Sequence, residues 1–466
     1  MKYESFIIYT SLPILHTFCS LIYALAILSI LCDPIYMNPK KLLRKVAPKK
    51  LIALSEETYR KTRVAGSHLR FRLPTRGLRV IAITGTNGKT TTCNFLNDVL
   101  RHAGYSTAMF TTAVVEMAGQ RTANTIHRTV PHTKELFQFL ADANDHNVDF
   151  VILETTSHAL HQHKVWGIPI EIAVMTNLSQ DHLDYHGTME KYAESKARLF
   201  SGYMNPKTCI LNADDEWFDY YKKKSVGRIL TYGKSKNADM RISTLKLSGE
   251  GITLRLDTND YSIVTSAPVI GEFNGYNLTA VATIAHSIGI APDEIKKAIA
   301  SVQDVPGRME LIRSSQGFTA VIDYAHGPDA LEKALEALQA TAKGKVSVVF
   351  GATGERDTSK RPIMGKVVAK NADNIYLTDD ETYSEDSDTI RQEVMVGIKT
   401  GGGVSKTTEI ADRYSAIKQA LSDAKKGDMI LIAGLGHQDY RAMNEGNIPW
   451  QETEVVRNIL KEIGRE

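Results

Sequence analysis

Cysteine is scarce in this 466-residue sequence, and its four residues, Cys19, Cys32, Cys93 and Cys209, show no paired spacing. Scattered cysteines argue against a disulfide framework and against a structural zinc site, and they are typical of a reducing compartment. Internal repeats and low-complexity tracts are absent as well. A chain of this length is too long for one ordinary domain, so the sequence predicts two or three domains.

The sequence also has no large excess of charge of either sign. Its net charge is +3, and residues 1–50 contain seven Lys or Arg and two Asp or Glu, a local balance of +5 (seven minus two) that leaves −2 for the remainder. The basic excess is therefore one local patch. This distribution argues against a nucleic-acid-binding surface, and we predict no nucleic-acid partner.

Long apolar runs are rare, and residues 6–31 form the one uncharged run long enough to span a bilayer. The basic stretch KKLLRKVAPKK follows at residues 40–50, and the positive-inside rule keeps it in the cytoplasm with the N-terminus outside. We therefore expect a transmembrane anchor in residues 1–36, a basic linker or truncated N-terminal region over residues 37–77, and a cytoplasmic body anchored to the inner membrane. Two alternatives stay open: Met37 is the true start, or the segment is cleaved.

Short β-rich runs alternate with helical patterns beyond residue 77. The runs include LRVIAIT, FVILET and IEIAVMTN, and their alternation with helices predicts an α/β domain with a mostly parallel sheet. The β-patterned pieces within residues 228–268 predict a small antiparallel subdomain. The segment PGRME at residues 306–310 predicts a linker, after which the strand–helix rhythm restarts. We therefore predict a central domain over residues 78–307 and a second, Rossmann-like domain over residues 308–466.

A glycine loop, GTNGKT, lies between the first predicted strand and a predicted helix, at residues 85–90. Backbone N–H groups and a helix N-terminus at such a junction favour phosphate. Lys89 can neutralise a β- or γ-phosphate, and Thr90 can place a hydroxyl on Mg²⁺. The loop is shorter than the usual G-x-x-x-x-G-K-[ST] motif, so a tight turn without nucleotide stays open as the alternative.

Polar side chains follow two further strands of the predicted sheet. Glu154 ends the run FVILE, and Asp181 and His182 follow the run IEIAVMTN. Ligands of open α/β sheets bind at the carboxyl ends of the strands, and a carboxylate there is a natural magnesium ligand. Each of these residues could instead cap a helix. Their convergence on one edge with the glycine loop favours a P-loop domain with a nucleotide–metal site.

Several further motifs occur in a fixed order: NLSQDHLDYHGTMEKYAESKARLF, LNADD, GEFNGYNL, PGRME, VIDYAHGPDAL, GERDTSKRP and IAGLGHQDY. From about residue 78 to its C-terminus, the sequence resembles the Mur ligase family, the ATP-dependent amide-bond synthetases of peptidoglycan assembly. That family uses the short loop GTNGKT. The combination of DHLDYHG, DYAH and RDxxKRP resembles the MurE type, which adds a diamino acid or a related third residue.

The resemblance implies an acyl-phosphate mechanism with ATP, two Mg²⁺ sites and a carbamylated lysine, Lys196. The implied catalytic residues are Lys89, Lys196, Glu154 and His182. The implied ATP contacts are Gly85, Thr86, Asn87, Gly88, Lys89, Thr90, Thr91, Asn274, Arg308 and Asp323. The implied metal ligands are Thr90, Glu154, His182 and Lys196. The implied acceptor contacts are Thr129, Thr156, Gln162 and Lys164. The implied amino-acid contacts are Arg356, Asp380, Glu381, Tyr383, Gly434 and Gln438.

The sequence departs from the MurE pattern at both substrate sites. The usual acceptor motif TTP reads TVP at residues 129–131. Only residues 38–77 separate the predicted membrane segment from the first strand, where the family carries a UDP-binding domain. An acceptor linked to lipid is therefore an alternative to one linked to UDP. The amino-acid motif DNPR reads DETY at residues 380–383, and GKGHE reads GLGHQ at residues 434–438. Tyrosine in the place of arginine predicts lysine or ornithine rather than meso-diaminopimelate, unless the pocket is built elsewhere.

Two other functions stay open at this point. One is a different ligase of the superfamily, acting on a lipid-linked or non-peptidoglycan acid or amidating with ammonia from a partner; the lack of a cysteine zinc cluster weakens the amidating version. The other is a non-catalytic nucleotide-binding scaffold at the membrane. The retention of the implied catalytic residues favours an enzyme whose partners are a muropeptide-type acceptor and an amino acid. We expect it to be a monomer.

Overall fold

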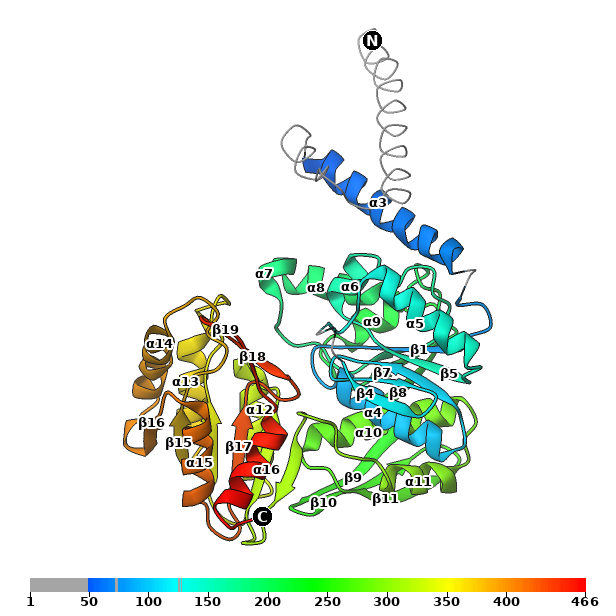
Figure 1. The fold of residues 1–466 in the computed structure, drawn as a ribbon. Coiled ribbons are helices and arrows are strands. Elements are labelled where there is room, and N and C mark those ends of the chain that lie inside the picture. Colours follow the sequence, from blue (N-terminus) through cyan, green and yellow to red (C-terminus); the bar gives the residue numbers. More distant parts are fainter. Residues whose placement is uncertain (1–48, 72–73, 125, 127) are drawn as a thin grey trace, which may run out of the picture.

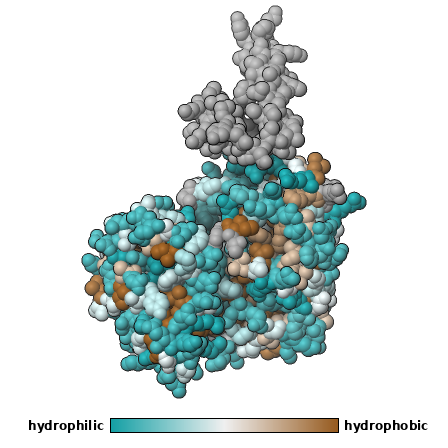
Figure 2. Space-filling model, viewed as in Figure 1, coloured by the Kyte–Doolittle hydropathy of each residue, from teal (hydrophilic) through white to brown (hydrophobic). Residues whose placement is uncertain are grey.

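The computed structural model describes residues 49–466 except 72–73, 125 and 127 (Figure 1). The predicted membrane segment, residues 6–31, lies outside this range. Within the described part of the chain, no helix is long and apolar enough to cross a membrane. Two α/β bodies stand side by side in Figure 1, the central body in cyan to green and the C-terminal body in yellow to red. Hydrophilic side chains cover most of the face that Figure 2 presents.

The first described element is a helix, α3 (Lys49–Arg70), in a region for which the sequence analysis expected a basic linker. Ion pairs one turn apart, Glu56–Arg60 at 3.1 Å and Glu57–Lys61 at 2.8 Å, favour helix here. The helix packs on α5 (Thr133–Asp145) of the central body, where the ring of His68 meets that of Phe137 edge-on at 4.5 Å. The sequence analysis expected a basic linker or a truncated N-terminal region over residues 37–77; that assignment stays a prediction, and its described part includes this helix.

The central body is built on one eleven-stranded sheet in the order β11-β10-β9-β8-β7-β6-β1-β5-β2-β3-β4. The strands of its parallel part are β1 (Val80–Thr84), β2 (Thr107–Phe110), β5 (Phe150–Glu154), β6 (Ile170–Met175), β7 (Thr208–Asn212) and β8 (Arg228–Gly233). One edge ends in β3 (Val114–Met117) and β4 (Gln120–Ala123). The other edge ends in β9 (Met240–Ser248), β10 (Gly251–Asp257) and β11 (Ser262–Ala267).

Helices cover both faces of this sheet because its central strands are apolar on both sides. Ile81 and Ile83 of β1 face one helical layer, and Val80 and Ala82 of the same strand face the other. The first layer consists of α4 (Lys89–His102), α10 (Glu272–Ser287) and α11 (Pro292–Ala300). The second layer contains α5, α6 (Ser157–His161), α8 (Met189–Ala197) and α9 (Phe218–Lys224), and the short α7 (Leu183–His186) packs on α8.

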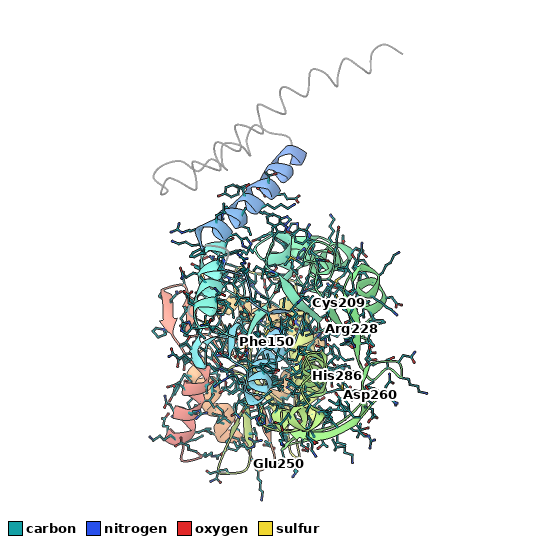
Figure 3. All side chains as sticks on the ribbon, turned by 90° about the vertical axis from the view of Figure 1, so that its right-hand side faces the viewer. Phe150, Cys209, Arg228, Glu250, Asp260 and His286 are labelled. Carbon is teal, nitrogen blue, oxygen red and sulfur yellow. The ribbon has the colours of Figure 1, made fainter. Side chains whose placement is uncertain are left out.

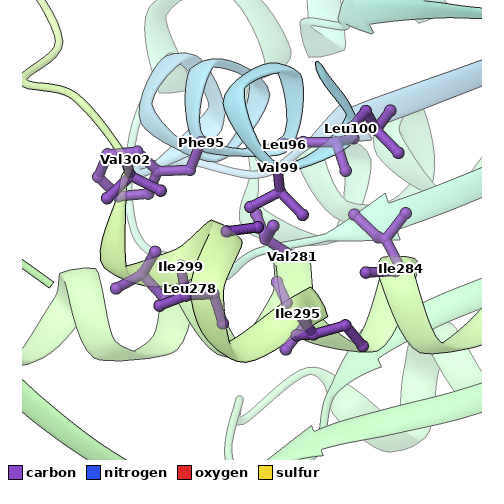
Figure 4. Close-up of a cluster of buried hydrophobic side chains, with 14 of the residues drawn as sticks. Phe95, Leu96, Val99, Leu100, Leu278, Val281, Ile284, Ile295, Ile299 and Val302 are labelled. Atoms are coloured by element: carbon purple, nitrogen blue, oxygen red, sulfur yellow. The ribbon is translucent and has the colours of Figure 1, made fainter. Parts of the chain in front are cut away.

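The first helical layer holds the glycine loop in place, because α4 begins at that loop. Figure 4 shows Phe95 of α4 beside Val302, with Ile299 of α11 below them, and Val99 of α4 pointing toward Val281 of α10. All five side chains are at most 1% exposed. Full burial of each such side chain contributes roughly 1.5–3 kcal/mol, so this cluster fixes the axis of α4 against the sheet.

The β-patterned pieces at residues 228–268 do not form a separate subdomain. Strand β8 extends the parallel part of the central sheet, β9 pairs with β8 in parallel, and only β10 and β11 continue antiparallel. The turns that join these last strands, at Glu250 and Asp260, lie at the periphery of the molecule (Figure 3). The predicted subdomain is thus an edge of the main sheet, because the backbone of β8 forms hydrogen bonds with the free edge of β7.

The C-terminal body contains a six-stranded sheet in the order β12-β13-β17-β14-β15-β16, parallel except for the β12–β13 pair. Its strands are β12 (Glu310–Arg313), β13 (Thr319–Asp323), β14 (Val346–Phe350), β15 (Asn374–Leu377), β16 (Thr407–Glu409) and β17 (Met429–Ala433). Its helices are α12 (Pro328–Gln339), α13 (Lys360–Asn371) and α14 (Ser387–Thr400) on one face, and α15 (Arg413–Asp423) and α16 (Glu452–Glu462) on the other. A hairpin of β18 (Tyr440–Met443) and β19 (Gly446–Pro449) follows β17. The predicted α/β class with a large, mostly parallel sheet and a second domain is confirmed.

Candidate active site

The glycine loop joins the end of β1 to the start of α4, and its two glycines fit where no side chain could. A Cβ on Gly85 would lie 1.8 Å from Oγ1 of Thr176, at the end of β6. A Cβ on Gly88 would lie 2.4 Å from Oδ1 of Asn277 on α10, and its φ of 80° is a left-handed value that L-residues avoid. The loop therefore needs glycine at both positions in order to lie between β6 and α10.

Hydrogen bonds hold the rest of the loop in one conformation. The backbone N–H of Thr86 donates to the carbonyl of Asn177 at 2.8 Å, and its hydroxyl donates to the carbonyl of Ser179 at 3.1 Å. The ammonium of Lys89 donates to the carbonyl of Thr86 at 2.7 Å. Burial lowers the pKa of Lys89, and Glu154 opposes that shift. The lysine is thus folded over the loop, with a carboxylate nearby to balance its charge.

Three of the four predicted metal ligands lie at or after strand ends: Thr90 follows β1, Glu154 ends β5 and His182 follows β6. The hydroxyl of Thr90 donates to Oε2 of the buried Glu154 at 3.0 Å, and the N–H of Thr112 donates to the same oxygen at 2.7 Å. Nε2 of His182 lies 3.5 Å from Oδ2 of Asp181. Burial lowers the pKa of His182 to about 4, so its imidazole is neutral at pH 7 and can ligate a metal.

These side chains do not form a complete metal cage by themselves. Within the described residues, no group of three or more His, Cys, Asp or Glu side chains is arranged to hold a metal ion. Lys196 reaches the same loop from α8, where it is 1% exposed and donates to the carbonyl of Gly85 at 2.6 Å. Desolvation and the nearby Lys89 lower the pKa of Lys196 well below its usual value. The structure therefore brings Lys196 to the glycine loop.

A cavity of about 330 Å³ lies between the two bodies, beside the glycine loop. Six of the predicted ATP contacts line it: Asn87, Gly88, Thr91, Asn274, Arg308 and Asp323. The guanidinium of Arg308 lies 4.7 Å from the ring centre of Tyr324, and its buried Nε has no hydrogen-bond partner. Burial raises the pKa of Asp323, whose Oδ2 accepts from the N–H of Met309 at 2.8 Å. An unpartnered buried donor at a cavity wall fits an anionic ligand such as a nucleotide.

Other residues of the cavity wall carried no assignment from the sequence. Phe273 and Tyr276 of α10 and Lys333 of α12 line it, together with Asp214 from the motif LNADD. The hydroxyl of Tyr276 donates to Oδ2 of Asp214 at 2.9 Å. The motif LNADD was a visible signal, whereas single aromatic residues on a helix resemble ordinary core positions. Only the packing of the two bodies distinguishes them.

The predicted acceptor residues lie on the central body, near Glu154. Thr129 accepts from the hydroxyl of Thr112 at 2.7 Å, and Thr129 and Glu154 line a small cavity of about 10 Å³. The ammonium of Lys164 donates to the carbonyl of Val130 at 3.2 Å. Thr156 caps α6, and the amide of Gln162 donates to the hydroxyl of Tyr185 at 3.3 Å. Their role in acceptor binding stays a prediction.

The predicted amino-acid residues gather on the C-terminal body. The guanidinium of Arg356 lies 5.8 Å from the ring centre of Tyr383. Glu381 is 6% exposed, and its carboxylate accepts from the amide of Gln438 at 3.3 Å and from the N–H of Ala442 at 3.2 Å. Burial raises the pKa of Glu381. The residues that replace the two family motifs, Glu381 and Gln438, are therefore direct partners.

Close packing also fixes the loop that follows β17. A Cβ on Gly434 would lie 2.0 Å from Oδ2 of the buried Asp380. Two loops that the sequence analysis assigned to one pocket thus lie against each other. Their contact with the amino acid stays a prediction.

Comparison with known proteins decides the family. The model described as the Mur ligase middle domain matches residues 83–285, and the model described as Mur ligase, glutamate ligase domain, matches residues 307–436. The chain belongs to the Mur ligase family. The two matches fall on the central and C-terminal bodies of this Mur ligase.

Individual relatives of this Mur ligase share one name. A UDP-N-acetylmuramoyl-L-alanyl-D-glutamate–2,6-diaminopimelate ligase of Geobacillus kaustophilus is 38% identical over 397 residues, covering 84% of this chain and 80% of that protein. The ligase of the same name from Aquifex aeolicus is 40% identical over 417 residues, covering 90% of this chain and 84% of that protein. A solved structure of a ligase with this name has a TM-score of 0.64 at 32% identity, and the match covers 89% of this chain and 84% of that one. The predicted Mur ligase of the MurE type, an ATP-dependent acid–amino-acid ligase, is confirmed.

Proposed function

We propose that this MurE-type ligase joins an amino acid to a carboxylate of a muropeptide precursor and converts ATP to ADP and phosphate. The observation that carries the proposal is the cavity at the glycine loop, whose wall joins the two bodies and includes the unpartnered guanidinium nitrogen of Arg308. A nucleotide there would have its phosphates at the N-terminus of α4. The acceptor residues would then lie on one body and the amino-acid residues on the other.

The reaction has two steps. An oxygen of the acceptor carboxylate attacks the γ-phosphorus of ATP, the bond to the bridging oxygen breaks, and ADP leaves. The amino group of the second substrate then attacks the carbonyl carbon, loses a proton, and displaces inorganic phosphate. Both steps gather negative charge near Lys89, so a fixed cation and backbone N–H donors supply most of the catalysis.

The residues at the loop fit a divalent metal. Thr90, Glu154, His182 and a carbamylated Lys196 would hold Mg²⁺ at two sites, where it would neutralise charge on the phosphates. The buried carboxylate of Glu154 and the neutral imidazole of His182 are suitable donors. The lowered pKa of Lys196 supports carbamylation, because the neutral amine is the form that adds CO₂.

The proposed acceptor rests on the names of the relatives. Their names specify UDP-N-acetylmuramoyl-L-alanyl-D-glutamate, and we propose a muropeptide of this class as the acceptor here. A lipid-linked muropeptide remains the alternative that the apolar residues 6–31 suggest. We also propose that this segment anchors a cytoplasmic body. Fractionation of cells that express the full chain or a chain starting at Met37 tests the anchor, and equal solubility of the two would refute it.

A screen for ADP release tests the function. The purified chain is incubated with ATP, Mg²⁺ and pairs of acceptor and amine, with UDP-linked and lipid-linked muropeptides as the two acceptor classes. We expect ADP release only when both an acceptor and an amino acid are present, with an amide product of the summed mass minus water. Release of ADP that ignores the acceptor, or no release with any pair, would contradict the proposal.

A further inference from the structure

One carboxylate of the C-terminal body reaches across to the glycine loop of the central body. Oδ2 of Asp329 accepts from the side-chain amide of Asn87 at 3.0 Å and from the hydroxyl of Ser179 at 3.3 Å. Asn87 lies in the glycine loop, and Ser179 follows β6. Lys333, one turn further along α12, donates to the same carboxylate at 3.0 Å. Two hydrogen bonds between the bodies thus end on a single oxygen atom.

The two partners of Asp329 are held firmly on the central body. The backbone N–H of Asn87 donates to Oδ1 of Asn177 at 3.0 Å, and its carbonyl accepts from the hydroxyl of Thr176 at 2.7 Å. The N–H of Ser179 donates to the hydroxyl of Thr86 at 3.0 Å. The backbone of Asn87 is thus held by residues that follow β6, and its side-chain amide remains available for the hydrogen bond to Asp329.

The position of Asp329 in its own helix favours a charged carboxylate that can bond to the other body. It occupies the first turn of α12, directly after Pro328, where a negative charge interacts favourably with the helix dipole. Its side chain is 44% exposed. A hydrogen-bonded carboxylate that remains in contact with water contributes only modestly to stability, so this contact can break at a small cost in free energy.

We propose that Asp329 is a positioning residue that docks the amino-acid-binding body onto the phosphate loop. This inference rests on the proposed function, in which the acyl phosphate forms at Lys89 and the amine is bound around Arg356 on the other body. The amine can attack only when the two bodies are correctly aligned, since reacting groups must approach to about 3–3.5 Å. Asp329 supplies that alignment through Asn87 and Ser179, and it does not line the cavity beside the glycine loop.

Kinetic separation of the two steps tests the role. Hydroxylamine traps the acyl phosphate as a hydroxamate and needs no amino-acid pocket. For Asp329→Ala we expect hydroxamate formation at saturating ATP within about twofold of wild type. We expect the KM for the amino acid to rise about 10-fold, which corresponds to about 1.4 kcal/mol. Asp329→Asn, which keeps an acceptor oxygen for both donors, should lie near wild type. Equal loss in both assays would overturn the proposal.

Two further variants exclude a general structural effect. Ser179→Ala removes one donor, and in combination with Asp329→Ala it should add nothing to the single change, because both act on one contact. Full additivity would count against the proposal. Glu336→Gln removes an exposed negative charge from the same helix and should leave the KM for the amino acid unchanged.

Small-angle X-ray scattering separates this inference from the proposed function, because it requires no reaction. We expect Asp329→Ala to have a larger radius of gyration than wild type and Glu336→Gln to match wild type. An unchanged radius would refute the docking role even if the enzyme is an active ligase. A chain that makes no hydroxamate with any acceptor would refute the proposed function, whatever the scattering shows.

Discussion

Thr90 and Glu154 are joined by a 3.0 Å hydrogen bond from the threonine hydroxyl to Oε2 of the carboxylate. The two residues are 64 positions apart in the sequence, and the parallel pairing of β1 with β5 places Ile83 directly opposite Glu154. The pairing therefore sets the carboxylate beside the first turn of α4. This relationship links the phosphate loop to the acidic group on which the proposed metal site depends.

Removal of the charge at Glu154 should abolish most of the activity without unfolding the protein. Glu154→Gln keeps the side-chain shape and an oxygen for the Thr90 hydroxyl, so we expect a thermal midpoint close to wild type. Loss of the anionic ligand should lower kcat for ADP release by about 100-fold or more. ADP release and thermal unfolding measure the two effects. Near-normal kcat would contradict the role of Glu154.

Lys196 should support activity only as the carbamate. We expect Lys196→Ala to lose most ligation, and the wild-type enzyme to lose activity in CO₂-free buffer and regain it with bicarbonate. The carbamate carbon should be visible by NMR after addition of ¹³C-bicarbonate. Lys191→Ala, an exposed lysine on the same helix, is the matched control. Full activity of Lys196→Ala would remove this role.

The two left-handed glycines Gly88 and Gly104 separate backbone strain from steric conflict. Their φ angles are 80° and 88°, but a Cβ on Gly104 meets nothing within 4 Å. Alanine at either position should cost about 1–2 kcal/mol of stability through the backbone. Gly88→Ala should lose more and should also weaken nucleotide binding, because its Cβ collides with Asn277. Chemical denaturation and ADP titration compare the variants, and equal losses would argue against the steric explanation.

His163 should make the protein less stable in mild acid. Burial lowers its pKa from 6.5 to about 4, so between these values the unfolded chain binds a proton that the folded chain does not. Stability attributable to this residue is therefore intact above pH 6.5 and falls as the pH drops towards 4. His163→Asn, which suits the φ of 58°, should show a smaller drop in thermal midpoint between pH 7 and pH 4.5. His146→Asn at an exposed site is the control, and parallel curves for wild type and His163→Asn would refute the assignment.

The amino-acid pocket should prefer lysine or ornithine to meso-diaminopimelate. Tyr383 cannot make the bidentate bond that an arginine makes to a distal carboxylate, and Glu381 adds a negative charge beside it. One lost charged pairing is worth on the order of 2–4 kcal/mol, or roughly 30- to 1000-fold in selectivity. The selectivity is measured as the ratio of kcat/KM values for the three amino acids with one acceptor. The names of the relatives specify 2,6-diaminopimelate, and a clear preference for its meso form would overturn the argument.

The complementary exchange tests the same pocket from the other direction. Glu381→Asn with Tyr383→Arg should shift kcat/KM towards meso-diaminopimelate. Glu381 is buried and bonded to Gln438, so its replacement alone leaves that amide without a partner. The control for this exchange is therefore Glu381→Gln, which keeps an oxygen for Gln438 and removes only the charge.

The sequence by itself determined the chemistry of the loop and the class of the fold. The motif at residues 85–90 is recognisable from consecutive residues, and the apolar runs of β1, β5 and β6 predict parallel strands because both of their faces are buried. The contact between Thr90 and Glu154 also followed, since carboxyl ends of parallel strands share one edge. These properties are local or follow from a simple rule of sheet topology.

Tertiary structure decided the features that depend on long-range pairing. The attachment of β8 to β7 turned an expected subdomain into a sheet edge. The contact between Asp329 and Asn87 joins residues 242 positions apart, and nothing in either local pattern marks it. Such contacts depend on how the two bodies fit together, and local periodicity carries no information about that fit.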